Sequence, residues 1–233
     1  MPQMQNRGSL GSVFHLMQLC DSALPVGGFS FSCALESAAE QGAVRDAATL
    51  EEYIRTVVSQ TLRMDGVAAL HAFRNSHNRD RLHSIDALLH SRKPSLEWRT
   101  MSCRMGRKLA ELGAAILPCP DLDNWLGDIT AGRTPGSYAT TQGLLFSLCG
   151  AHEEELFTAV GYGTATMIAG AALRLLRVTH LDTQRIIFSL ADLVERLYGE
   201  VSGWSLDKME GFAPQVEILS SLHERGKQRM FMS

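Results

Sequence analysis

The chain has 233 residues, of which 45% are hydrophobic and 20% are charged, and its formal net charge at pH 7 is −3. This composition is typical of a soluble globular protein, and the small net charge argues against nucleic acid or a membrane surface as its partner. The five cysteines are odd in number and form no C-x-x-C pair, which argues against a disulfide framework.

Recognisable targeting signals are absent from the sequence. Residues 1–20 have neither the charged start nor the apolar core of a signal peptide. The longest apolar stretch, residues 166–176, is too short to span a bilayer. We therefore expect a cytoplasmic protein.

The first expected helix runs from residue 10 to a turn at residues 21–29. Pro25 fixes its own φ and pushes the preceding residue toward extended backbone, so a helix should end before it. Gly27 and Gly28 then permit positive φ and close approach of another backbone. We interpret Phe29 as an apolar anchor for this turn.

The next two helix starts are predicted from capping residues. Ser30 or Ser32 is the expected N-cap of a helix that runs past Glu36. Thr49-x-x-Glu52 has the spacing of a capping box for the helix that follows.

Apolar stripes at spacings of three and four predict further helices over residues 50–64, 98–116, 156–170 and 187–197. Polar joints are expected near residues 43–48, 76–79, 92–95, 118–123, 131–137, 150–153 and 177–182. No segment alternates as a β-strand does. The prediction is one all-α domain over residues 1–233, with eight to ten helices and with mobile segments at 1–9 and about 222–233.

Catalytic and metal-binding motifs are missing. The chain has no G-x-x-x-x-G-K-[ST], G-x-S-x-G or H-E-x-x-H sequence. Cys149-x-x-His152 has a chelating spacing, but a packed thiol beside a surface histidine is the better interpretation. We expect no catalytic residue, no cofactor and no metal site.

Small residues such as Gly161, Gly163 and Gly170 are expected to admit a close helix neighbour.

Two basic features have alternative interpretations. Residues 74–108 carry nine basic and three acidic side chains, either as a docking face or as the solvated sides of two helices, and we favour the second. Arg174 lies on the small-residue stripe of its helix. Its guanidinium must therefore extend into solvent or find a partner, such as an interface carboxylate or a set of backbone carbonyls.

The end of the chain combines basic residues with an apolar cluster at Met230, Phe231 and Met232. A segment of this kind is typical of a tail that becomes ordered on a partner. The alternative is that it docks on its own domain.

Three stretches of sequence together resemble the UreF family of urease accessory proteins. The first is Asp21-Ser22-Ala-Leu-Pro25-Val-Gly27-Gly28-Phe29, followed by Leu-Glu36. The second is Phe212-Ala-Pro214, Glu217, His223-Glu and Arg229-Met-Phe231-Met-Ser233. The third and weaker one comprises Gly143-Leu-Leu, Ala171-Ala-Leu-Arg174 and Asp182-Thr-Gln184. Members of the family commonly have a histidine where this chain has Phe31, and another near Ser137.

The resemblance implies a non-catalytic chaperone for nickel insertion into apo-urease. Such a protein would be a homodimer that binds UreD (also called UreH) and with it recruits the GTPase UreG. By position, Glu217, His223, Arg229, Phe231 and Ser233 are the candidate UreD contacts. Arg174 and Gln184 are candidates for partner binding or for gating of the GTPase, and residues 21–29 with Glu36 form a signature turn.

Two other functions remain open from the sequence. One is a factor that stimulates the UreG GTPase directly by supplying an arginine. The other is an unrelated helical protein that binds a small ligand, which would need a deep apolar pocket with convergent polar groups.

Overall fold

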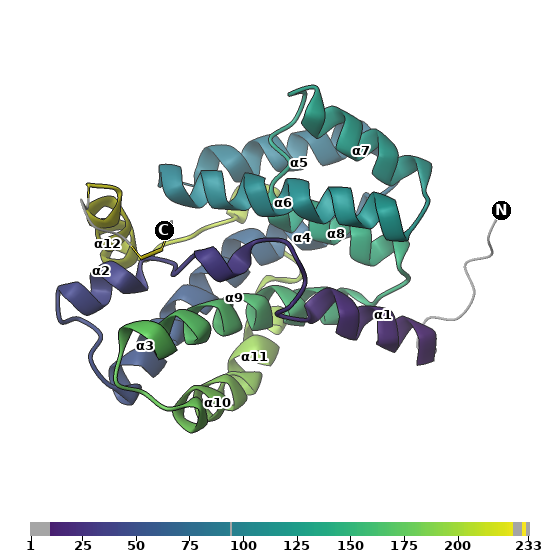
Figure 1. Ribbon diagram of the computed structural model, residues 1–233. Helices are drawn as coiled ribbons and strands as arrows, with labels where there is room; N and C mark the ends of the chain where they lie inside the picture. Colours follow the sequence, from purple (N-terminus) through teal and green to yellow (C-terminus); the bar gives the residue numbers. More distant parts are fainter. Residues whose placement is uncertain (1–9, 94, 226–229, 232–233) are drawn as a thin grey trace.

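The computed structural model describes residues 10–93, 95–225 and 230–231, and these ranges contain helices and turns but no β-strand (Figure 1). The α-helices are α1 (Leu10–Cys20), α2 (Leu35–Glu40), α3 (Ala47–Thr61), α4 (Val67–Arg74), α5 (Arg79–Arg92), α6 (Leu96–Ile116), α7 (Pro120–Thr130), α8 (Tyr138–Leu148), α9 (Glu153–Leu175), α10 (His180–Ser189), α11 (Ala191–Val201) and α12 (Pro214–Arg225). Three short turns complete the order, η1 (Gly28–Ser30), η2 (Leu62–Gly66) and η3 (Leu206–Lys208).

The predicted all-α class and the predicted helix number are both confirmed. The π-helical turn η2 joins α3 to α4 without a break, and α10 and α11 are separated by Leu190 alone. The helices of the described residues therefore form ten continuous runs. Of the two expected mobile segments, residues 1–9, 226–229 and 232–233 lie outside the described part of the chain.

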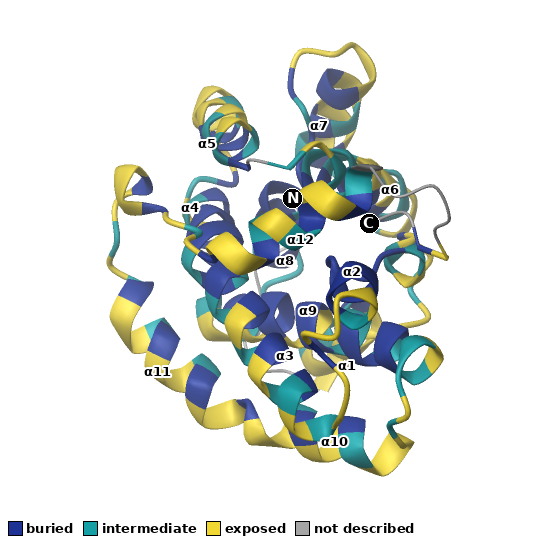
Figure 2. Cartoon of the chain, turned by 90° about the vertical axis from the view of Figure 1, so that its left-hand side faces the viewer, coloured by how far each residue is buried: buried dark blue, intermediate teal, exposed yellow. Residues whose placement is uncertain are grey.

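Helix α9 is the centre of the fold (Figures 1 and 2). It contacts α1, α2, α3, α4, α8, α10 and α11. One continuous hydrophobic cluster runs from Leu19 near the start of the described chain to Phe231 at its end. The helices of the described residues therefore share one core.

The same helix is long and apolar enough to cross a membrane by length and composition, which the sequence analysis did not anticipate. However, 61% of its most apolar window is buried inside the protein, as expected of a core helix.

The small residues of α9 were expected to admit a close helix neighbour, and this holds for only some of its glycines. A Cβ at Gly161 would touch Leu62 and Val194, whereas nothing lies within 4 Å of a Cβ at Gly163 or Gly170.

Two predicted helix starts were wrong in detail. Helix α2 has Ala34 as its N-cap, in the left-handed conformation with φ 64°, and Ser32 contributes an acceptor at 3.5 Å from the Glu36 N–H. The capping box of α3 pairs Asp46 with Thr49, because the helix begins three residues earlier than expected. In addition, helix α7 begins at Pro120, within the polar joint expected near residues 118–123.

A second group of helices, α4, α6 and α8, packs at very short range through glycine. A Cβ added at Gly143 of α8 would lie 2.3 Å from the Ala69 carbonyl oxygen of α4. A Cβ at Gly106 of α6 would meet the backbone carbonyl of Gly136 at 2.0 Å. Backbone atoms cannot rotate away as a side chain can, so these positions require glycine.

We predict that Gly143→Ala lowers the free energy of unfolding by about 1–3 kcal/mol or more, because α4 and α8 must separate. The matched control is Gly127→Ala in α7, where nothing lies within 4 Å of the new methyl group. The control should be neutral or stabilising by up to about 1 kcal/mol. Urea denaturation measures both, and equal stability of the two variants would contradict this packing.

Candidate partner-binding site

The signature sequence near the start of the chain and the C-terminal motif meet at the carboxylate of Glu36 on α2. Its Oε1 accepts a hydrogen bond from the backbone N–H of Met230 at 2.7 Å, and its Oε2 accepts one from the N–H of Phe231 at 3.1 Å. The same Oε2 lies 3.0 Å from Nε2 of His223 on α12. The signature turn and the C-terminal motif, 187 residues apart, thus share one side chain.

His223 lies between two carboxylates. Its Nε2 faces Glu36, and its Nδ1 lies 2.9 Å from Oε2 of Glu97 on α6. The histidine is 3% exposed and Glu36 is 6% exposed, so water does not compete for these contacts. A neutral imidazole has a single N–H, so both contacts are hydrogen bonds only when the ring carries a proton on each nitrogen.

Further polar contacts fix α12 against the start of α6. The Glu224 carboxylate accepts hydrogen bonds from the Ser95 hydroxyl at 2.9 Å and from the Glu97 N–H at 3.2 Å. Ser220 donates to the Ser95 hydroxyl at 2.8 Å. Figure 1 shows α12 beside α2 and the end of the chain. Glu217, another predicted contact, is half-exposed on α12 and does not join this cluster.

Arg174 near the end of α9 connects the signature turn to the C-terminal segment. Its guanidinium carbon lies 4.1 Å from the centre of the Phe29 ring and 4.3 Å from the centre of the Phe231 ring. The Nη2 group donates to the Phe29 carbonyl at 3.1 Å, and Nε donates to the Gly170 carbonyl at 3.3 Å. The side chain therefore extends from the small-residue stripe to two aromatic rings and two backbone carbonyls.

This arrangement corrects the expectation for Phe29 and decides between two alternatives for Phe231. Phe29 is not a buried anchor, because it is 75% exposed and covers one side of Arg174. Phe231 is 4% exposed and docks on its own domain, the alternative to ordering on a partner. The neighbouring Met230 is 65% exposed. Arg229 and Ser233 lie outside the described residues.

The rest of the signature turn has a structural explanation. Gly27 has a φ of 86°, which glycine adopts without strain. A Cβ on Gly28 would lie 3.3 Å from the Met105 methyl group, and the Asp21 carboxylate accepts from the Ala23 N–H at 2.8 Å. The remaining signature positions, Ser22 and Pro25, are exposed.

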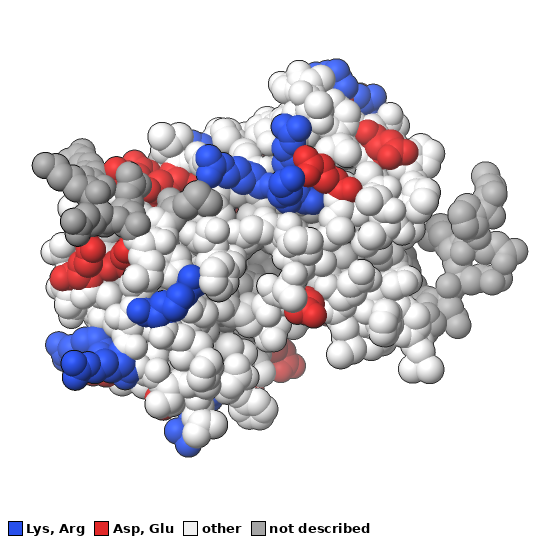
Figure 3. Space-filling model, in the orientation of Figure 1, with Lys and Arg blue, Asp and Glu red and all other residues white. Residues whose placement is uncertain are grey.

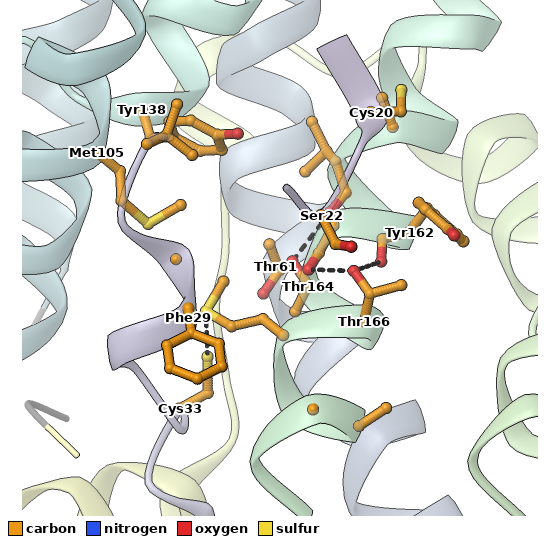
Figure 4. A pocket seen from close by; sticks show the side chains of 18 of the residues that line it. Cys20, Ser22, Phe29, Cys33, Thr61, Met105, Tyr138, Tyr162, Thr164 and Thr166 are labelled. Carbon is orange, nitrogen blue, oxygen red and sulfur yellow. Dashed lines mark hydrogen bonds between the residues drawn. The ribbon is translucent and has the colours of Figure 1, made fainter. Parts of the chain in front are cut away.

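A cavity of about 430 Å³ lies between the signature turn, α6, α9 and α10 (Figure 4). Arg174 and Gln184 both line it, but Gln184 has no part in the cluster around Glu36. Figure 3 shows that the middle of this side of the molecule is hollowed and carries few charged side chains. Such a surface suits contact with another protein more than recognition of a charged polymer.

The cavity wall contains a buried ion pair that sequence reasoning missed. Lys93 Nζ lies 2.7 Å from both carboxylate oxygens of Asp65, and both residues are buried. Asp65 belongs to the π-helical turn η2, a feature without a sequence signal here. Beside it the Cys33 thiol lies 3.8 Å from the Met167 sulfur, and burial raises the pKa of this thiol to about 12.

Comparison with known proteins identifies the family. The UreF family matches residues 44–191. A urease accessory protein UreF 2 of Brucella canis is 43% identical over 227 residues, which cover 97% of this chain and 93% of that protein. The chain belongs to the UreF family. A urease accessory protein UreF of Yersinia enterocolitica is 36% identical over 221 residues, which cover 94% of this chain and 97% of that protein. The family places this chain in urease maturation.

The basic stretch of this UreF chain is used mostly within the protein. Most of its cations bind carboxylates or carbonyls of their own chain, and these are Arg74, Arg79, Arg92, Lys93, Arg99, Arg107 and Lys108. Arg79 shares the fully buried Asp128 carboxylate with Arg133 and His83. Hydrogen bonding from Arg79 is the main reason why the pKa of Asp128 lies far below its usual value. The stretch is therefore not a free basic surface.

Metal ligands do not gather in the part of the chain that the structure describes. Within residues 10–93, 95–225 and 230–231, no three His, Cys, Asp or Glu side chains are arranged to hold one ion. Cys149 ends α8 and His152 caps α9. Burial raises the pKa of the Cys149 thiol to about 11, which disfavours the thiolate that a metal would need.

We predict that Glu36→Ala releases the C-terminal segment and lowers the free energy of unfolding by about 2–4 kcal/mol, because two backbone N–H groups and His223 lose their acceptor. Glu40→Ala on the same helix is the control, since Glu40 is exposed. Thermal unfolding and limited proteolysis report the two effects. If both variants behave like wild type, the carboxylate does not hold the segment.

The stability that Glu36 contributes should depend on pH. Burial alone would raise the pKa of this carboxyl group, but hydrogen bonds from His223, Met230 and Phe231 outweigh burial and lower the pKa. The carboxylate therefore stabilises the folded state above the unfolded glutamate pKa of about 4.3. This contribution is lost as pH falls through the lower folded pKa.

We expect the stability difference between wild type and Glu36→Gln to be largest near pH 7 and to shrink as pH falls from about 5 to 3. Denaturant titrations at several pH values measure it. Asp128 also responds to acid, but it is common to both proteins and cancels in the difference. A pH-independent difference would contradict this role for the carboxylate.

Proposed function

We propose that this UreF protein is a non-catalytic scaffold in urease maturation that binds UreD (UreH) through its C-terminal surface. The observation that supports the proposal most directly is the meeting of the two family motifs at Glu36, beside exposed apolar side chains. We define the C-terminal surface as Phe29, Phe212, Ile218, Leu222 and Met230, all of which are exposed.

Helix α12 has the two faces that such a role needs. Val216, Ser220 and His223 point into the protein and are buried. Ile218 and Leu222, one helical turn apart, are exposed on another face. Exposed apolar residues spaced in this way are typical of a helix that docks against a partner.

The proposal extends to recruitment of the GTPase UreG by the UreF–UreD pair, to nickel insertion into apo-urease and to a homodimer in the cytoplasm. A second apolar surface supports self-association. On α1 the exposed residues Leu10, Val13, Phe14 and Met17 recur at spacings of three and four. Helix α1 lies at the opposite end of the molecule from α12, so both surfaces are accessible at once (Figure 1).

Two other functions stay as alternatives. A direct GTPase-activating role would require an arginine whose replacement by alanine removes stimulation of UreG while leaving binding unchanged. A small-ligand function is favoured only by the 430 Å³ cavity, which has an apolar lining and a buried ion pair. A screen of small molecules by thermal shift would test the second alternative.

We predict that deletion of residues 222–233 abolishes UreD binding and leaves the helical content nearly intact. The deletion also removes the buried His223 and Phe231, so a milder variant is needed. Ile218→Ala/Leu222→Ala changes only exposed side chains and should alter stability by less than about 1 kcal/mol. We expect it to weaken UreD binding at least tenfold.

The matched control is Leu181→Ala, an equally conservative change at an exposed position of α10. Size-exclusion chromatography with light scattering detects the complex, and calorimetry gives its affinity. If the double variant and the truncated protein bind UreD like wild type, the C-terminal surface is not the UreD contact.

A further inference from the structure

The guanidinium of Arg174 is held in place by contacts that include no carboxylate of the described residues. Other arginines of this chain bind carboxylates directly, as Arg63 binds Glu200 and Arg74 binds Glu153. Arg174 instead donates to two backbone carbonyls, and no carboxylate among the described residues forms an ion pair with it. The side chain is nevertheless exposed at the surface.

The residues around Arg174 hold its guanidinium in one orientation, which favours the binding of an anion. The rings of Phe29 and Phe231 lie 4.1 and 4.3 Å from the guanidinium carbon, so two aromatic rings pack against the guanidinium and restrict its rotation. The hydrogen bonds use Nε and Nη2, which leaves Nη1 without an acceptor among the described residues. An arginine ordered in this way loses little side-chain entropy when it binds an anion.

The charged residues around Arg174 favour a carboxylate over a phosphate group as its ligand. The acidic side chains of Glu36 and Glu97 lie in the cluster that Phe231 joins, and Arg174 is the described cation that contacts the Phe231 ring. A phosphate dianion would normally require several cations, whereas one guanidinium suits one carboxylate. An arginine in contact with aromatic residues, beside exposed apolar side chains, is also typical of an interface hot spot.

We propose that Arg174 receives the carboxylate of an aspartate or glutamate side chain from the protein that docks on the C-terminal surface. The proposal rests on the function given above, since it assigns the chemistry of the partner at that site. Arg174 then provides specificity at an otherwise apolar contact, because a partner without the acid would leave the guanidinium covered and unpaired.

The binding experiment uses full-length protein and UreD at low and high salt. We expect Arg174→Gln to weaken the complex at least tenfold and Arg174→Lys to weaken it less. Arg177 is an exposed arginine two residues past α9 that contacts no aromatic ring of the described residues, and Arg177→Gln should bind like wild type. Equal affinity of wild type and Arg174→Gln would overturn the proposal.

Chemical crosslinking then identifies the acid. In the UreD complex of the Arg174→Lys variant, a carbodiimide activates the partner carboxyl group, which then forms an amide with the new amine and releases the activating group as a urea. Mass spectrometry of the digested complex should find a peptide of UreD joined at position 174. A crosslink confined to Glu36 or Glu97 of the same chain would overturn the proposal.

A titration of the free protein tests whether Arg174 binds a carboxylate, and its result does not depend on whether UreD is the partner. N-acetyl-aspartate amide, titrated into labelled protein, should shift the Nε resonance of Arg174 saturably, and N-acetyl-asparagine amide should not. The Nε resonance of Arg177 is the internal control. If UreD does not bind but the aspartate probe does, the scaffold function fails and the acid site stands. Equal shifts at both arginines would overturn the acid site itself.

Discussion

The carboxylate of Glu36 is the contact on which the C-terminal half of the candidate site depends. It accepts hydrogen bonds from the backbone N–H groups of Met230 and Phe231 and faces a buried histidine. Removing it would leave these buried groups without acceptors, which costs more than the net value of any one hydrogen bond. The position of Phe231, and with it the second ring over Arg174, follows from this one side chain.

The cluster also explains why the signature turn and the C-terminal motif occur together in one chain. The turn supplies Phe29 and is followed by Glu36, and the C-terminal motif supplies His223 and Phe231. Arg174 of α9 lies between the two. Because α9 is the core helix, the surface that these residues form has a fixed position relative to the rest of the protein.

The local features of the fold could be predicted from the sequence, because helix periodicity and capping act within a few residues. Even so, Ala34 with its positive φ was not foreseen as a cap, since a nonglycine residue in that conformation depends on the surrounding packing. The pairing of Glu36 with His223 could not be predicted either. Its partners are 187 residues apart, and a lone glutamate or histidine gives no sign of what it contacts.

For Arg174 the sequence predicted that the guanidinium needs either a partner or solvent, and the structure shows which partners it has. Its place on a small-residue stripe required a partner or solvent, and it has two carbonyls, two rings and an exposed edge. Phe231 shows the limit of such reasoning. An apolar residue in a basic tail suits a partner surface and its own domain equally well, and only the geometry around Glu36 distinguishes them.

The most direct test of this account is amide hydrogen exchange at Met230 and Phe231 in the free protein. If Glu36 accepts from both N–H groups, these amides exchange slowly in wild type and become fast in Glu36→Gln. Fast exchange in wild type, with no change on substitution, would contradict the docking of the C-terminal segment and with it the composite site.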